Sequence, residues 1–217
     1  MEEILHIPVN IPVANIKLPG DLIIPHGAKA TIIFSHGSGS SRFSSRNKMV
    51  AQYLHKKKFA TLLFDLLTEE EDKNYNNRFN IDLLTTRLAG ATEWLERVPT
   101  AIRDFRTGYF GASTGAASAL KAASFIPDIS AVVSRGGRPD LVMKDLPNVK
   151  APTLLIVGSL DYDVLQLNRQ AYTQLRCQKK LEVVAGATHL FEEPGKMEIV
   201  SELAGNWFEK YLVPVKV

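Results

Sequence analysis

The chain has 217 residues, of which 45% are hydrophobic and 23% are charged, and its formal net charge at pH 7 is +3. This length and composition predict a globular protein with one sizeable core, so we expect a single domain over residues 1–217. The basic residues are scattered, apart from Lys56, Lys57 and Lys58, which we interpret as a solvated helix end. The charge pattern gives no indication of a nucleic-acid partner.

The cysteine content and the N-terminal segment indicate the cellular compartment in which the protein is expected. Cys177 is the single cysteine, which excludes a disulfide within the chain and a metal site built on cysteines. Residues 1–6 carry acidic side chains where a signal peptide would carry basic ones, and no apolar run approaches the roughly 20 residues of a membrane span. We expect a soluble, cytoplasmic protein with no membrane partner, no metal and no other cofactor.

The first 25 residues predict antiparallel or edge strands. Residues 4–9 and 11–18 alternate apolar and polar side chains loosely, and each segment contains a proline, which cannot donate to a central ladder. A turn is expected at residues 19–21, followed by a returning strand over residues 21–25.

From residue 30 onward, uninterrupted apolar runs alternate with segments that have helical spacing. This alternation predicts a mostly parallel sheet with helices on both faces and ligands at the carboxyl ends of the strands. The acidic, Asn-rich residues 68–80 are expected to form a surface loop. The expected strands are residues 30–35, 59–67, a run just before Ser113, 129–134, 153–157 and 181–184, and the expected helices are residues 46–58, 82–98, 115–125, 164–176 and 198–212.

One stretch organises the candidate chemistry. An apolar run leads into Gly111-Ala112-Ser113-Thr114-Gly115, and an Ala-rich run follows. This order indicates a strand, a sharp turn and a helix, with Ser113 at the apex. Glycines flank the turn because side chains there would collide with the strand or the helix. The pattern alone also occurs by chance, so a nucleophilic role for Ser113 requires a base, an acid and an oxyanion hole elsewhere in the chain.

Chain order selects the base among the five histidines. Three of them fall in the N-terminal strands or on a helix, where a structural role is expected. His36 and His189 each follow an expected strand. In an arrangement that runs serine, acid, histidine, only His189 lies after both Ser113 and a strand-end acid, and we assign it as the base.

Two neighbouring carboxylates are candidates for the acid. Asp161 comes directly off an expected strand, three residues after Gly158. Asp163 lies nearer the following helix, where an N-cap is the common role of aspartate. We favour Asp161, whose carboxylate would accept the imidazole N–H and stabilise the imidazolium. Asp65 also ends a strand and is a further alternative, although it precedes Ser113 in the chain.

The oxyanion hole is expected to use two backbone N–H groups. One belongs to Thr114, the residue after the nucleophile, and the other comes from the loop that follows the strand at residues 30–35. That loop reads His36-Gly37-Ser38-Gly39, and we choose Ser38 as the second donor. A plain Gly/Ser turn is the alternative interpretation of the loop.

The ordered motifs resemble those of the α/β-hydrolase superfamily, and within it the dienelactone hydrolase-like proteins. The resemblance covers residues 18–212 and implies an α/β-hydrolase fold and hydrolysis of carboxyl esters by a serine triad. Dienelactone hydrolases proper use cysteine at the elbow, whereas this chain has Ser113. Two further segments resemble small bacterial and archaeal hydrolases, some of which are fused to phosphoribosyltransferase domains. The motifs are His36-Gly37-Ser38-Gly39, Gly111-Ala112-Ser113-Thr114-Gly115, Gly158-Ser159-Leu160-Asp161 and Gly186-Ala187-Thr188-His189, and the two segments are residues 64–71 and 134–140.

Arginines at two strand ends are candidates for substrate binding. Arg135 and Arg138 follow one strand, and Arg42 and Arg46 follow the His-Gly loop. Such a pair can hold a carboxylate or phosphate by bidentate hydrogen bonds, and Arg135 and Arg42 are our choices. Bonds to loop carbonyls or to a carboxylate such as Asp140 are the alternative.

The expected function is hydrolysis of a small carboxylic ester, lactone or thioester through an acyl-enzyme, with Ser113, His189 and Asp161 as the triad. Residues 137–151 leave room only for a minimal lid, so the site is expected to be open. The alternatives are a catalytically idle binding or regulatory module, and an acyltransferase or perhydrolase on the same triad. The expected partner is a small ester-type molecule, and the expected assembly is a monomer or a homodimer.

Overall fold

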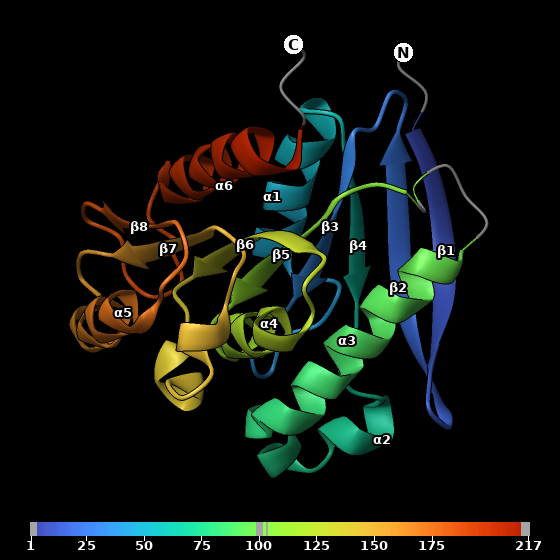
Figure 1. Cartoon of the computed structure of the whole chain (residues 1–217), viewed down its shortest axis with the longest axis horizontal. Coiled ribbons are helices and arrows are strands. Elements are labelled where there is room, and N and C mark those ends of the chain that lie inside the picture. The colour runs from blue at the N-terminus through green and yellow to red at the C-terminus, as the bar shows by residue number, and fades with distance from the viewer. Residues whose placement is uncertain (1–3, 99–101, 103, 214–217) are drawn as a thin grey trace.

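The computed structural model describes residues 4–98, 102 and 104–213, and in these residues one eight-stranded sheet has the order β1-β2-β4-β3-β5-β6-β7-β8 (Figure 1). The two N-terminal strands join it antiparallel, and the other six pair in parallel. The predicted mostly parallel sheet with antiparallel N-terminal strands is confirmed. The strands are β1 (Ile4–Val13), β2 (Ile16–Pro25), β3 (Ala30–Ser35), β4 (Phe59–Phe64), β5 (Thr107–Ala112), β6 (Ile129–Arg135), β7 (Thr153–Gly158) and β8 (Lys179–Val184).

The N-terminal hairpin turns earlier than its sequence indicates. β1 and β2 pair from Val13 opposite Ile16, so the reversal lies at Ala14, which has a φ of 53°. The turn expected at residues 19–21 is wrong because this segment lies inside β2. A Cβ atom on Gly20 would lie 2.9 Å from the Cβ of Phe64, so its glycine permits close strand packing rather than a turn.

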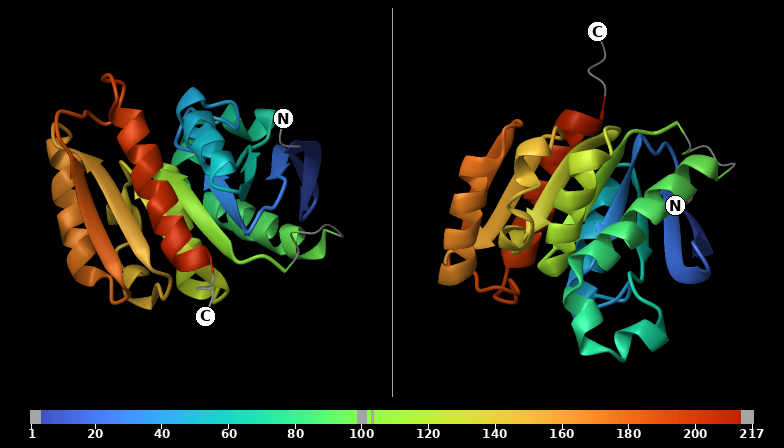
Figure 2. Two further views of the ribbon diagram at one scale, coloured as in Figure 1. Left: turned by 90° about the horizontal axis from the view of Figure 1, so that it is seen from above. Right: turned by 60° about the horizontal axis from the view of Figure 1, so that its bottom comes forward.

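Helices cover both faces of the sheet, as predicted. α1 (Ser45–Lys56) and α6 (Lys196–Leu212) lie on one face, and α3 (Ile81–Arg97), α4 (Thr114–Phe125) and α5 (Tyr162–Gln174) lie on the other (Figures 1 and 2). All six residues of β3 are buried, because this central strand has helices on both sides. Ile33 packs into the core beneath α3 and α4, whereas Ile32 and Phe34 pack into the core beneath α1 and α6.

The segment after β4 is more ordered than a surface loop. It holds α2 (Glu69–Asp72) and the 3₁₀ helix η1 (Tyr75–Phe79), so the loop expected at residues 68–80 is corrected. Thr68 and Glu71 form a capping box, in which each side chain accepts a hydrogen bond from the other residue's backbone N–H. Glu71 also accepts a 2.6 Å hydrogen bond from Arg87 of α3, which fastens the segment to the core.

The segment between β6 and β7 forms a small cap at the carboxyl edge. It contains two 3₁₀ helices, η2 (Pro139–Val142) and η3 (Leu146–Asn148), in place of a large lid. No helix in the described part of the chain is long and apolar enough to cross a membrane.

Candidate active site

Ser113 stands at the turn between β5 and α4 in a backbone conformation that residues with side chains rarely adopt. Its φ is 51° and its ψ is −120°. Neighbouring backbone groups hold it there: its N–H donates to the Arg135 carbonyl at 3.1 Å, and its own carbonyl accepts from the N–H groups of Ala116 at 3.1 Å and Arg138 at 3.2 Å. The end of β6 and the chain just after it therefore fix the turn.

Two glycines make this turn possible. A Cβ atom on Gly111 would lie 2.7 Å from the carbonyl oxygen of Gly115. A Cβ atom on Gly115 would collide with the carbonyl oxygens of Ser35 and His36, at the end of β3. The first turn of α4 thus lies against the backbone of the neighbouring strand, which is the crowding that the motif predicts.

His189 and Asp161 are hydrogen-bonded to each other. The His189 Nδ1 atom lies 2.6 Å from Asp161 Oδ2. Because a carboxylate only accepts, Nδ1 carries the proton and Nε2 remains available as a base. Asp161 occupies the N-cap position of α5, but its side chain makes no capping hydrogen bond and is turned to His189 instead. N-capping was the role expected of Asp163, which lies two residues further on.

Ser113, Asp161 and His189 line one cavity of about 460 Å³ at the carboxyl edge of the sheet. Three loops that are distant in sequence meet there, since the parallel strands β5, β7 and β8 end at the same edge. The remaining lining residues are Arg138, Asp163, Val164 and Leu167.

Helical periodicity did not identify Val164 and Leu167 as cavity walls. Both belong to the first turns of α5, and apolar residues at this spacing are equally typical of a core-facing helix. Only the pairing of Asp161 with His189 shows that this end of α5 faces the cavity.

Of the two predicted oxyanion donors, Thr114 follows Ser113 directly, whereas Ser38 lines a separate small cavity and not the one around Ser113. Thr114 is buried at the first position of α4, and Ser38 lies in the loop after β3. Neither backbone N–H donates to an acceptor among the described residues. The Ser38 loop touches the elbow through Gly37, on which a Cβ atom would lie 3.2 Å from the Cβ of Ser113.

Arg42 and Asp65 are joined by a hydrogen bond and an ion pair. The backbone N–H of Arg42 donates to Asp65 Oδ1 at 2.7 Å, and its guanidinium forms ion pairs with Asp65 and, at 3.5 Å, with Asp21. Arg42 lines a separate cavity of about 310 Å³ next to α1. The structure thus places Arg42 and Asp65 in a brace between loops, outside the lining of the Ser113 cavity.

Arg138 and Arg135 differ in their surroundings. Arg138 lines the Ser113 cavity, and its Nε and Nη2 atoms each donate to Asp140 at 2.8 Å, which is the alternative that the sequence left open. Arg135, like Arg42, is not among the residues that line the Ser113 cavity. It is only 6% exposed, its guanidinium lies 5.9 Å from the ring centre of Phe191, and that guanidinium has no hydrogen-bond partner in the described part of the chain. Burial, and secondarily the charge of Arg46, lowers the pKa of Arg135 to about 10.

No group of three or more His, Cys, Asp or Glu side chains among the described residues is placed to hold a metal ion.

Comparison with known proteins gives relatives of two lengths, and no protein-family model matches the chain. Two proteins from two strains of Mycobacterium tuberculosis, named as candidate phosphoribosyl transferases, are each 50% identical over 205 residues. These residues are 94% of this chain but only 46% of each relative. The chain therefore spans about half the length of the curated relatives it matches.

A solved structure matches the chain over almost its whole length. The dienelactone hydrolase from Anabaena variabilis is 50% identical with a TM-score of 0.93, and the match covers 96% of this chain and 99% of that one. The chain belongs to the dienelactone hydrolase family. The resemblance seen in its motifs is confirmed, and the family consists of α/β-hydrolases.

More distant structures share the fold of this dienelactone hydrolase family member. An esterase from Pyrococcus furiosus is 18% identical with a TM-score of 0.78, and it matches over 96% of this chain and 92% of its own. Est1E from Butyrivibrio proteoclasticus is 16% identical with a TM-score of 0.80, over 94% of this chain and 98% of its own. At these identities the likeness concerns the fold alone.

Proposed function

We propose that the protein is a serine hydrolase that cleaves a small carboxylic ester, lactone or thioester through an acyl-enzyme on Ser113. The observation that carries the proposal is the hydrogen bond from His189 to Asp161 in a cavity that Ser113 also lines. Membership of a hydrolase family supports the same reaction class. The transferase name belongs to proteins about twice as long, of which the match covers 46%.

In the proposed mechanism, His189 Nε2 takes the hydroxyl proton of Ser113 as its oxygen attacks the carbonyl carbon. Asp161 keeps the imidazole in the required tautomer and stabilises the imidazolium. When the tetrahedral intermediate collapses, His189 gives the proton to the leaving group, and the acyl group stays on Ser113. Water activated by the same histidine then releases the acid and regenerates the enzyme.

The proposed oxyanion site uses the backbone N–H groups of Thr114 and Ser38. Thr114 begins the 12-residue helix α4, and the dipole of that helix adds positive potential at its N-terminus. No acidic residue in the first turn of α4 offsets this potential. Such preorganised donors act where charge develops in the transition state, and losing one typically costs about 10²–10³ in kcat.

Arg135 is our candidate for recognising an anionic group on the substrate. A buried guanidinium without a hydrogen-bond partner is costly, and a carboxylate would supply both charge and acceptors. Arg135 adjoins the elbow through its carbonyl, and its guanidinium packs on Phe191, two residues after His189. Arg42 is already paired with two aspartates, so its contacts support bracing, and we carry the substrate-binding hypothesis forward for Arg135 alone.

Removing the nucleophile tests the reaction. We expect Ser113→Ala to reduce hydrolysis of p-nitrophenyl acetate to the background rate, because no acyl-enzyme can form. Ser38→Ala is the matched control and should keep wild-type turnover, since only the backbone N–H of Ser38 is used. Release of p-nitrophenol is followed by absorbance, with folding checked by circular dichroism. Wild-type turnover by Ser113→Ala would rule out the mechanism.

A second pair of variants identifies the acid. Asp161→Asn should lower kcat by orders of magnitude, because an amide no longer stabilises the His189 imidazolium. Asp163→Asn, two residues away in the same cavity, should stay within about threefold of wild type, an effect of less than 1 kcal/mol on the barrier. Steady-state kinetics with the same ester measures both. A large loss in Asp163→Asn alone would move the acid to that position.

Substrate charge provides the test for Arg135. Two p-nitrophenyl esters with acyl chains of equal length are compared, one neutral and one with a terminal carboxylate. Arg135→Leu should lower kcat/KM for the anionic ester by about 10-fold or more relative to the neutral one, because a charge-assisted hydrogen bond is lost. Arg42→Leu should leave that ratio unchanged. An unchanged ratio in Arg135→Leu would exclude Arg135 from substrate binding.

A further inference from the structure

His36 is a buried histidine that the proposed triad does not use. It follows β3 directly, is 8% exposed, and begins the loop that carries Ser38. Its ring makes two hydrogen bonds to backbone groups: Nδ1 lies 3.0 Å from the carbonyl oxygen of Gly37, and Nε2 lies 3.0 Å from the backbone nitrogen of Leu66. One side chain thus connects the oxyanion loop to the segment after β4.

These two bonds determine where the imidazole proton resides. A backbone N–H can only donate, so the Nε2 atom that faces Leu66 is the acceptor and carries no proton. The proton is therefore on Nδ1, which donates to the carbonyl oxygen of Gly37. Burial lowers the pKa of His36, which favours this neutral form.

The bond to Gly37 fixes the orientation of one peptide group. The carbonyl of Gly37 and the N–H of Ser38 belong to the same planar trans peptide and point in opposite directions. A carbonyl held by His36, and also by the N–H of Ser40 at 3.2 Å, directs the Ser38 N–H away from the imidazole. This N–H has no acceptor among the described residues.

We propose that His36 is a positioning residue for the oxyanion hole, which sets the direction of the Ser38 N–H through the Gly37 carbonyl. The inference rests on the proposed serine hydrolase function. Its contribution is geometric: the N–H is already aligned before charge develops on the substrate oxygen, so no reorganisation is needed during the reaction.

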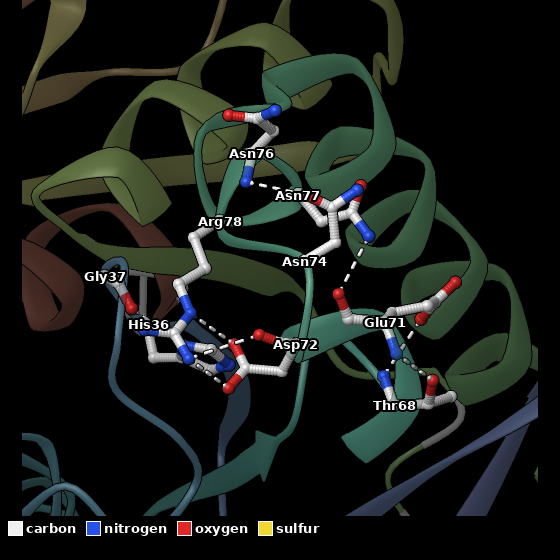
Figure 3. A network of polar contacts seen from close by, with 9 residues as sticks. All are labelled: His36, Gly37, Thr68, Glu71, Asp72, Asn74, Asn76, Asn77 and Arg78. Carbon is white, nitrogen blue, oxygen red and sulfur yellow. Dashed lines mark hydrogen bonds and ion pairs between the residues drawn. The ribbon is translucent and has the colours of Figure 1, made fainter.

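Residues of the segment after β4 lie next to His36 and the oxyanion loop. Arg78 of η1 donates from Nε and Nη2 to the carboxylate of Asp72 at 2.8 Å and 2.7 Å (Figure 3). This pair lines a small cavity together with His36, Gly37 and Ser38. A Cβ atom on Gly39 would lie 3.7 Å from Arg78 Nη1, so the guanidinium stands over the loop. The loop is thereby enclosed between the elbow and an ordered segment.

Asparagine and glutamine separate the two bonds of His36. In His36→Asn the amide nitrogen takes the place of Nδ1, which keeps the bond to Gly37 and loses the one to Leu66. In His36→Gln the amide oxygen reaches the place of Nε2, which keeps the bond to Leu66 and loses the one to Gly37. In His36→Asn the Leu66 N–H loses its acceptor, whereas in His36→Gln the Gly37 carbonyl still accepts from the N–H of Ser40. A purely structural role therefore predicts that His36→Asn is at least as disruptive as His36→Gln.

The experiment measures kcat and KM for p-nitrophenyl acetate, at a temperature where circular dichroism shows wild type and both variants folded. We expect His36→Gln to lower kcat by about 10-fold or more with little change in KM, and His36→Asn to stay within about threefold of wild type. Affinity for an alkyl boronic acid, which mimics the tetrahedral intermediate, should fall in parallel with kcat in His36→Gln.

Equal losses of kcat in the two variants, or losses that only follow the folded fraction, would overturn the role of His36 while leaving the hydrolase proposal intact. Wild-type protein is also treated with a fluorophosphonate probe. If it neither labels at Ser113 nor hydrolyses the ester, the proposed function fails, and the inference on His36 fails with it.

Discussion

Backbone contact between the β5–α4 turn and the end of β3 is the constraint on which the site depends. Gly115 lies so close to the carbonyl groups of Ser35 and His36 that no side chain fits between them. This contact sets the positive-φ turn at Ser113 directly against the loop that bears Ser38. The candidate nucleophile and both candidate oxyanion donors are thus fixed by close packing of main chain, which a parallel sheet with its buried central strands makes rigid.

The order of the strands in the sheet places the remaining site residues next to that contact. Because β5, β6, β7 and β8 are neighbours, the loops that follow them converge on one side of the elbow. The hydrogen bond from His189 to Asp161 joins the last two loops, and the backbone bonds of Ser113 to Arg135 and Arg138 join the first two. On the opposite side, β4 contributes the ordered segment with Arg78 and Asp72, which encloses the oxyanion loop.

The sequence was sufficient to predict the sheet, its helices and the meeting of Ser113, Asp161 and His189 in one cavity, because apolar runs and chain order are local or topological signals. It misplaced the first hairpin turn, since Gly20 is needed for contact with Phe64, a residue of a distant strand. It also missed α2, although Thr68 and Glu71 have the spacing of a capping box. Ion-pair partners such as those of Arg42 depend on which loops the fold brings together, and neighbouring residues do not specify them.

The proposed mechanism requires that Ser113 becomes acylated during turnover. Wild-type enzyme mixed with p-nitrophenyl acetate can be quenched in acid within the first turnover, digested and analysed by mass spectrometry. The proposed mechanism predicts an acetyl group on the peptide that contains Ser113, formed as fast as the first p-nitrophenol is released and lost as steady-state turnover continues. Acetylation confined to another residue, or turnover with no acetylated Ser113 at any quench time, would contradict it.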